Sequence, residues 1–389
     1  MFKYISTSLL LCTFLSAESF DIFLQKAIDR SAYLYAHSLE IKESEIEADI
    51  SLKYENPTLE LTHSSFKPTN NKADDGYILN LSQPVRLWGI KDDTKALNSA
   101  NIKTKNASFS QKKAEFIRNI SLKYTIYSEQ KRVLELAKEE IAIAKKIYEI
   151  SALRFQNGAI SKGVELQALL DYEKSQNSKE FAHINTISSY YDLLGTADAK
   201  EETELDDGYD FTLKRAIHES KNPSIELLSA QKDSALMEAK VNSHAIKSID
   251  IFGEFESEPE QDIFRFGVNI PLAIFNDNKE EAKLSTLRAS KFDSLSKNEK
   301  NITSMELKKL YKERDALLKL KASCARTLQT EVELLAMYED GYKISSINLI
   351  ELQEIKNKML QSKRALIEIG TALNKNAINT NYIKGVYNE

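Results

Sequence analysis

The sequence has few of the residues that interrupt regular secondary structure. Its 389 residues include only 11 glycines and 6 prolines, whereas 29% are charged. A globular enzyme of this length would normally need more turns, so the composition predicts long uninterrupted helices. Cysteine is also scarce, with Cys12 and Cys324 alone. Because Cys12 falls in a predicted signal peptide, Cys324 would be the one cysteine of the mature chain, which excludes an internal disulfide.

Motifs for catalysis and cofactor binding are missing as well. The five histidines show no metal-ligand spacing, no glycine-rich phosphate loop follows a strand, and no nucleophile motif occurs. We therefore expect no enzyme activity, no cofactor and no metal site. The net charge of −5 at pH 7 argues against a nucleic-acid partner.

The first residues predict export. Lys3 precedes an apolar stretch over 5–15, and Ala17 is a small residue at which a peptidase could cleave. This pattern is typical of a secretory signal peptide over 1–17 and is too short for a membrane span. No later segment has the ~20 apolar residues that a membrane-spanning helix needs.

Two alternating segments suggest that the chain is built twice. Residues 77–85 and 264–272 alternate apolar with polar residues, carry a proline near their ends and run into long helical segments. The prolines, Pro84 and Pro271, are 187 residues apart. A preceding alternating run, an aromatic residue four places after each proline, and a later Glu-Leu-Gln sequence recur in the same order. Together these landmarks predict a duplicated unit of roughly 185 residues.

The predicted organisation has two repeats. The first covers 18–200, with strands at about 57–66 and 76–85, a long helix at about 89–157 and a returning helix at about 161–195. An acidic linker over 201–210, expected to be solvated, leads to the second repeat. That repeat covers 211–389, with strands at about 247–256 and 264–272, a long helix at about 277–340 and a returning helix at about 346–380.

The alternating segments have the length of membrane strands. Each spans about 10 residues, which a tilted strand needs to cross a bilayer. In the last segment Phe264 and Phe266 point to one face and Arg265 to the other. A soluble hairpin packed on helices would show the same alternation, so that alternative stays open. Four strands cannot close a barrel and an open edge in lipid is costly, so membrane strands would require several chains, three of which supply twelve strands.

The long helical segments predict extended rods. The segment 89–157 has no proline and no internal glycine. About 69 residues at ~1.5 Å each give a length on the order of 100 Å. Leu134, Ile141 and Tyr148 recur every seventh residue, with Ala137, Ala144 and Ser151 three places after them, which is typical of a closely packed coiled-coil seam. Further apolar residues on neighbouring faces favour a wall of helices over a plain two-stranded coiled coil.

In this order the features resemble the TolC-like outer-membrane efflux protein family. The resemblance covers essentially the whole mature sequence and rests on Asn56-Pro57-Thr58-Leu59, Leu81-Ser82-Gln83-Pro84, Arg154-Phe155-Gln156-Asn157-Gly158 and Gly341-Tyr342-Lys343-Ile344. It implies a mainly α-helical fold with a membrane β-barrel portion. The chain would be an internally duplicated protomer of a homotrimer, whose 12-stranded barrel lies in the outer membrane and continues into a long α-helical periplasmic tunnel.

The resemblance also implies a function and partners. The implied function is the passive exit duct of a tripartite efflux system, working with a periplasmic adaptor protein and an inner-membrane efflux pump. The competing interpretation is a periplasmic adaptor or coiled-coil scaffold protein without a channel. The segment Trp88-Gly89-Ile90-Lys91 resembles the heavy-metal efflux branch, so metal cations are one candidate cargo and drugs or other toxic small molecules are the other.

Candidate gate residues follow from the same match. Glu165, Glu351 and Glu354 match acidic tunnel positions of the family, and Tyr342 matches a tyrosine that helps to latch the closed tip. Independently, Glu351 and Glu354 are three apart and share a helix face, so a trimer would present two acidic rings that favour cations. Alternatively they are solvated surface groups. The basic residue expected five places after Tyr342 is Ile347 here, so any latch would use a different partner.

The docking contacts of the family map onto two predicted hairpin tips. These are Asn157-Gly158-Ala159 and Ile344-Ser345-Ser346. The second tip has Ser345 in place of the usual glycine, which leaves its turn geometry open.

Overall fold

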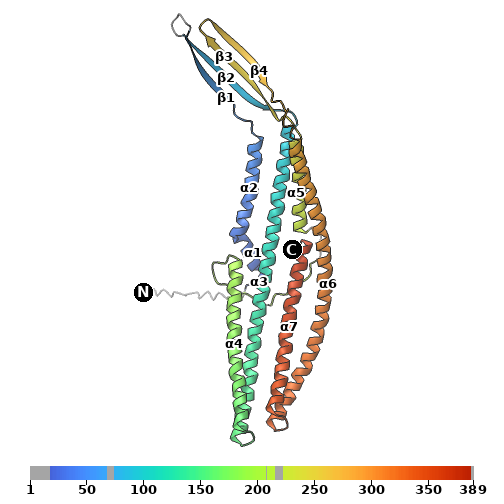
Figure 1. The fold of residues 1–389 in the computed structure, drawn as a ribbon. Helices are drawn as coiled ribbons and strands as arrows, with labels where there is room; N and C mark the ends of the chain where they lie inside the picture. Colours follow the sequence, from blue (N-terminus) through green and yellow to red (C-terminus); the bar gives the residue numbers. More distant parts are fainter. Residues whose placement is uncertain (1–17, 68–73, 207, 215–221, 387–389) are drawn as a thin grey trace, which may run out of the picture. The chain divides into compact units, whose positions relative to one another are not determined.

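The computed structural model describes residues 18–67, 74–206, 208–214 and 222–386 (Figure 1). The predicted signal peptide lies outside the described residues. The chain divides into two compact units. Among the described residues, the first unit comprises 18–34, 113–206, 208–214 and 304–386, and the second comprises 35–67, 74–112 and 222–303.

Helices dominate the described residues. In chain order the elements are α1 (Phe20–Arg30), α2 (Ala32–Leu52), β1 (Thr58–Phe66), β2 (Asp74–Arg86), α3 (Ile90–Gln156), α4 (Lys162–Thr196), α5 (Pro223–Asn242), β3 (Ser248–Glu258), β4 (Gln261–Asn269), α6 (Lys279–Lys343) and α7 (Leu349–Lys384). A helix, a hairpin of strands, a long helix and a returning helix therefore occur twice in one order. The origin of this order in a duplication stays a prediction.

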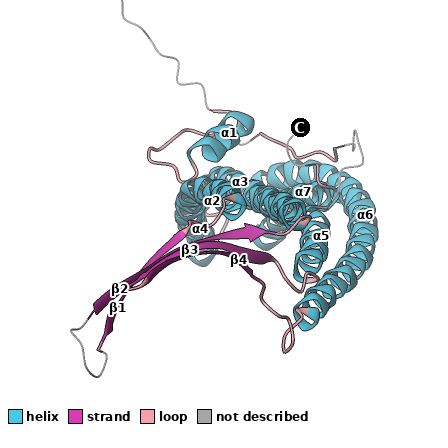
Figure 2. Cartoon of the chain, turned by 90° about the horizontal axis from the view of Figure 1, so that it is seen from above, coloured by secondary structure: helices cyan, strands magenta, loops and turns pink. Residues whose placement is uncertain are grey.

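The second unit contains one antiparallel sheet with the order β1-β2-β3-β4 (Figure 2). Leu59 pairs with Leu81, Leu81 with Gly253, and Gly253 with Phe266, so these residues lie in one row across the sheet. β4 ends at Asn269, before the predicted end at 272. Pro271 lacks the N–H that a longer ladder would use. Strands β1 and β4 form the two edges of this sheet, each with a neighbour on one side only.

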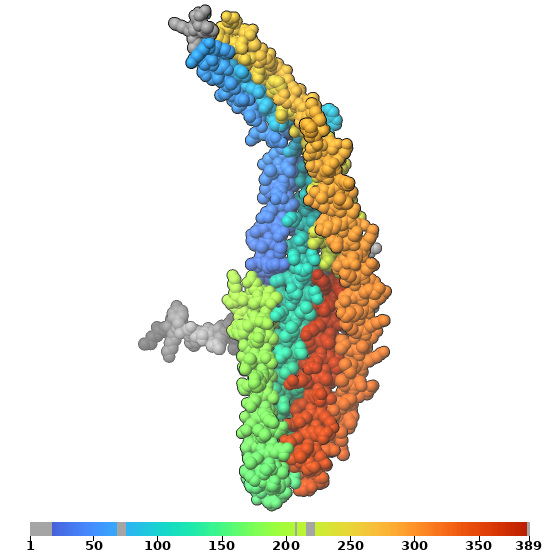
Figure 3. Space-filling view, viewed as in Figure 1, coloured from blue at the N-terminus to red at the C-terminus, as the bar shows by residue number. Residues whose placement is uncertain are grey.

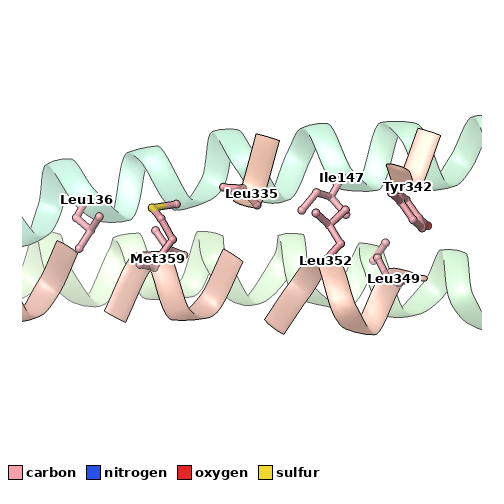
Figure 4. Close-up of a cluster of buried hydrophobic side chains, with 9 residues drawn as sticks. Leu136, Ile147, Leu335, Tyr342, Leu349, Leu352 and Met359 are labelled. Carbon is pink, nitrogen blue, oxygen red and sulfur yellow. The ribbon is translucent and has the colours of Figure 1, made fainter. Parts of the chain in front are cut away.

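The core of the first unit lies between four helices. Its buried cluster draws residues from α3, α4, α6 and α7, namely Leu136, Ile147, Ala168, Leu335, Tyr342, Leu349, Leu352, Met359 and Leu360 (Figure 4). Within the predicted seam on α3 the small residues are more buried than the large ones, since Ala137, Ala144 and Ser151 are 4%, 0% and 0% exposed. Small side chains at these positions let neighbouring helices approach closely, as the coiled-coil pattern requires.

The acidic linker is tied to the first unit. Leu205 is fully buried, and the hydroxyl of Tyr190 donates to the carbonyl of Thr203 at 2.9 Å while accepting from its amide at 2.8 Å. Glu18 adds a short parallel bridge to Leu205. Most of the described linker residues are exposed, as expected of a solvated linker, while the buried side chain of Leu205 and the bonds of Thr203 attach the segment to the first unit.

Candidate functional site at the hairpin tips

The first tip joins α3 to α4 through a glycine-terminated turn. Gly158 adopts a φ of 73°, and its amide donates to the carbonyl of Phe155 at 2.9 Å. The amide of Ala159 donates to the carbonyl of Arg154 at 2.8 Å. These two bonds form a Schellman motif, which satisfies carbonyls that a helix end leaves free. Glycine is favoured at the left-handed position because it has no Cβ.

The second tip, between α6 and α7, has the same geometry without glycine. Ser345 adopts a φ of 67°, and the amides of Ser345 and Ser346 donate to the carbonyls of Tyr342 and Gly341. A non-glycine residue in this region carries a strain of roughly 1–2 kcal/mol. Glycine is needed elsewhere in this turn, since a Cβ on Gly341 would lie 2.6 Å from Cγ1 of Ile347.

Arg154 joins the two tips. One of its nitrogens, Nη1, donates to the carbonyl of Tyr342 at 2.7 Å, and Nη2 donates to the hydroxyl of Ser345 at 3.0 Å. Its guanidinium carbon lies 4.4 Å from the centre of the Tyr342 ring, within the range of a cation–π contact. Arg154 thus supplies the basic partner of Tyr342 that the sequence left unidentified, while Ile347 packs inside the turn.

Two residues of α3 contact the side chain of Tyr342. The side chain is 1% exposed, and its hydroxyl lies 2.8 Å from Oγ of Ser151 on α3. Ser151 is itself fully buried and donates to the carbonyl of Ile147 when it is not donating to the tyrosine. The α6–α7 hairpin is therefore attached to α3 by Tyr342, with Ser151 at the hydroxyl and Arg154 over the ring.

Replacement of Ser345 tests the two opposing contributions at the second tip. Ser345→Ala keeps the strained backbone and loses the bond from Arg154, so we expect a loss of about 1 kcal/mol at this turn. Ser345→Gly loses the same bond but relieves strain of roughly 1–2 kcal/mol, so the turn should be unchanged or more stable. Amide hydrogen exchange at residue 346 measures both effects. Faster exchange in the glycine variant than in the alanine variant would contradict this assignment.

Glu165 does not present a free carboxylate. It lies in the first turn of α4, is 9% exposed and forms an ion pair with Lys162. Lys162 in turn lies 5.0 Å from the centre of the Phe155 ring. The ammonium group offsets the charge of Glu165 inside the chain itself.

Glu351 and Glu354 are both exposed, and each has a local partner. Asn348 is the N-cap of α7 and Glu351 is the third residue of the helix, and together they form a capping box. The amide of Glu351 donates to Oδ1 of Asn348 at 2.9 Å, and the carboxylate of Glu351 accepts from the Asn348 amide at 3.2 Å. This accounts for a glutamate at 351 without any channel. Glu354 lies 2.7 Å from Nζ of Lys358, whose ammonium group lowers the pKa of that carboxyl below its usual range. Sequence reasoning missed both partners, although Asn348 and Glu351 carry the spacing of a capping box.

The sheet of the second unit has two unlike faces. One face carries exposed apolar side chains, namely Leu59, Leu61, Leu79, Leu81, Ile251, Phe264, Phe266 and Val268. The opposite face carries Glu254, Glu256 and Arg265, and the arginine pairs with both glutamates. Such a large exposed apolar surface on one face of a sheet marks a contact with lipid or with another protein.

No family model matches the sequence, and no curated protein matches it. Solved structures do match its fold. The Campylobacter jejuni CmeC outer membrane channel is 17% identical, with a TM-score of 0.77 over 94% of this chain and 85% of CmeC. CusC, described in terms of transmembrane channel formation, is 12% identical, with a TM-score of 0.79 over 94% of this chain and 91% of CusC. The open MtrE outer membrane channel of Neisseria gonorrhoeae is 14% identical, with a TM-score of 0.75 over 94% of this chain and 88% of MtrE.

The chain has the fold of these outer membrane channels. At the level of fold, the resemblance drawn from the sequence is confirmed. None of the helices that the structure describes is long and apolar enough to span a membrane.

Both tips of this fold are open to contact. All six predicted docking residues, Asn157, Gly158, Ala159, Ile344, Ser345 and Ser346, are exposed, and Ile344 is 78% exposed. An isoleucine at the end of a turn gains nothing from this exposure in an isolated chain. Its position is consistent with a partner at the tips, which stays a prediction.

Proposed function

We propose that the protein is the outer-membrane exit duct of a tripartite efflux system. One observation carries the proposal: a sheet with an apolar exposed face, a charged opposite face and two edges that lack partners, in a chain with an efflux-channel fold. In lipid, unpaired backbone groups at a sheet edge are strongly unfavourable. The edges must therefore pair with other copies of the chain.

Three copies account for the sheet best. A single chain contributes four strands, and the smallest membrane barrels have about eight, which leave room for little more than side chains. Three chains give twelve strands and a lumen. In the homotrimer the barrel would lie in the outer membrane and the long helices would form a tunnel in the periplasm. There the exposed tips would meet a periplasmic adaptor protein and an inner-membrane pump.

Transport through this duct would be passive. The protein would conduct what a pump delivers and would hydrolyse nothing, so it is not an enzyme. Metal cations are the first cargo to test, because of the resemblance at residues 88–91, and drugs or other toxic small molecules are the second. A deletion strain that became sensitive to dyes and detergents and kept its tolerance of metal ions would exclude the metal cargo.

The competing function is a periplasmic adaptor or scaffold without a channel. Such a protein needs no lipid-facing strands, whereas this chain exposes Phe266 at 87% and Leu61 at 74%. Membrane fractionation and heat-modifiable gel mobility separate the two functions. A soluble monomer with no β signal in detergent would support the scaffold and end the duct proposal.

The gate would use Tyr342 with Arg154 as its latch, and Glu165, Glu351 and Glu354 as its charged positions. Lys162 and Lys358 reduce the charge of Glu165 and Glu354, so Glu351 would contribute most of the acidic field. Rings of carboxylates attract cations at close range.

Neutralising the two exposed glutamates tests the acidic rings. Glutamine at position 351 keeps the capping box, because Glu and Gln both serve at its third position, so Glu351→Gln with Glu354→Gln removes charge and retains the helix start. We expect cation selectivity and block by divalent cations to fall several-fold in single-channel recordings. Asn348→Ala, which breaks the cap and keeps both charges, is the control and should leave selectivity unchanged. Equal selectivity in the double variant and the wild type would remove the rings from the mechanism.

A further inference from the structure

One lysine of the first unit is fully buried. Lys356 lies on α7 between Leu352 and Met359, two members of the apolar core, and 0% of its surface is exposed. An ammonium group in such surroundings loses its hydration and needs a compensating charge. Nζ of Lys356 lies 2.5 Å from Oδ2 of Asp171 on α4, which supplies that charge.

The pair lies in the seam between the two helical hairpins. Asp171 belongs to the α3–α4 hairpin and Lys356 to the α6–α7 hairpin. One turn nearer the tips, Nε2 of Gln167 donates to Oε1 of Gln353 at 3.4 Å across the same seam. Figure 3 shows the surfaces of α4, in green, and α7, in red, adjoining toward the tips. Any separation of the two hairpins would therefore break the contact of Lys356.

Two further charges surround the pair. Glu140 on α3 interacts with Lys356, Asp171 and Arg364, and burial raises its pKa above the usual range although both cations oppose the shift. The group contains two acids and two bases, so its charge is balanced. Removing one member leaves a buried charge without compensation, which is more unfavourable than replacing a whole pair.

A buried ion pair and an apolar contact respond differently to separation. Apolar side chains that are pulled apart expose surface to water and gain nothing in return. A lysine and an aspartate that are pulled apart regain the hydration they lost on burial. A charged residue in an otherwise apolar seam also fixes the register in which helices pair, because a shifted register would leave the charge unpaired.

We propose that Lys356 and Asp171 form a second latch, set in the α4–α7 seam, which lets the α6–α7 hairpin separate from the α3–α4 hairpin and return in one register. The proposal rests on the proposed channel function, since separation of the hairpins is the movement that would open the tunnel. The contact of Lys356 with Asp171 joins α7 to α4 and involves a fully buried lysine. The contact of Arg154 with Tyr342 joins α3 to α6 and involves a partly exposed arginine. The latch makes two arrangements accessible, one closed and paired, the other open and hydrated.

Two variants should act in opposite directions. The double variant Lys356→Met with Asp171→Leu replaces the whole ion pair by apolar side chains, and such a replacement is often neutral or stabilising. It should lower the open probability of single channels about tenfold. Asp171→Asn removes the carboxylate in contact with Lys356 and leaves Glu140 as the one acid for the two cations of the group, so it should raise the open probability about tenfold. If Asp171→Asn does not assemble, the exchanged pair Lys356→Asp with Asp171→Lys takes its place and should restore wild-type opening.

A matched control lies on the same helix. Lys363 pairs with Glu139 on α3, and its side chain is 26% exposed while that of Glu139 is 43% exposed. Exposed pairs contribute little, so Lys363→Met should open and close like the wild type. The position of the hairpins is measured separately, by the distance between spin labels at positions 166 on α4 and 350 on α7, which are 50% and 65% exposed, with Cys324 replaced by serine.

The outcomes separate the latch from the channel. Shorter mean distances in the double variant Lys356→Met with Asp171→Leu and longer ones in Asp171→Asn support the latch. Shifts of both variants in one direction, or no difference of either from Lys363→Met, overturn it. If the wild type does not conduct while the label distances shift as expected, the proposed function fails and the latch between the hairpins stands.

Discussion

Replacing Arg154 by alanine is expected to release the α6–α7 hairpin from α3 and to leave the channel open for longer. The substitution removes a cation–π contact and two hydrogen bonds from a charged donor. A cation–π contact contributes about 0.5–2 kcal/mol and a bond from a charged group about 1.5–3 kcal/mol. Because Arg154 is partly exposed and water can replace part of this energy, the net loss is roughly 2 kcal/mol per protomer.

A loss of that size changes the ratio of closed to open hairpins by a factor of about 30. Single-channel recordings in planar bilayers measure the change directly, as a higher open probability or a larger conductance. Cells that produce the variant should become sensitive to bulky compounds that the intact outer membrane excludes. An unchanged conductance would show that the tips are held closed by other contacts.

Two milder substitutions divide the energy between its parts. Arg154→Lys keeps the charge and loses the planar group that stacks on the ring and bonds in two directions, so it should open the channel by an intermediate amount. Tyr342→Phe keeps the ring under Arg154 and loses the bond to Ser151, with an expected effect of about 1 kcal/mol. Arg154→Ala should open the channel most and Arg154→Lys less. The effect of Tyr342→Phe should be equal to that of Arg154→Lys or smaller.

Sequence periodicity was informative where one physical constraint dominates. The absence of proline and of internal glycine over 89–157 predicted a long helix, and α3 covers 90–156 of these residues. Alternation and the prolines located strands close to β2 and β4, with the end of β4 displaced by three residues because pairing stops before Pro271. The sequence was less informative where apolar residues do not follow one face of a helix. Apolar residues of α2 are distributed around the helix, and this helix was not predicted.

The contacts at the tips depend on tertiary proximity and could not be found from spacing. Arg154 and Tyr342 are 188 residues apart, and only the packing of α6 on α3 brings them together. The family pattern directed attention to position 347, whereas the cation comes from the other hairpin. Lys356 was passed over for a similar reason, since a lysine in a chain with 53 lysines and arginines is expected to be solvated. Its burial follows from its place in a core stripe, which the spacing of Leu352 and Met359 indicates.

The largest effect on assembly is expected from a charge on the apolar face of the sheet. Leu61 is 74% exposed on β1 and lies in one row with Leu79, Phe255 and Phe264. In a membrane barrel an arginine on the lipid face costs about 2–4 kcal/mol near the bilayer midplane, whereas the lumen face tolerates charge. Leu61→Arg should therefore reduce the amount of assembled trimer in the outer membrane several-fold, because the cost recurs in each copy.

The neighbouring residue provides the control at the same depth. Thr62 pairs with Ile78 on the opposite face of the sheet, the face that carries Glu254 and Arg265. Thr62→Arg introduces the same side chain one position along the strand, so it adds the same charge at nearly the same depth. We expect it to assemble like the wild type and to shift ion selectivity toward anions. Heat-modifiable gel mobility of membrane fractions measures the assembly of both variants. Equal loss in the two would mean that the apolar face does not meet lipid, because lipid would penalise the charge at residue 61 and not the charge at residue 62.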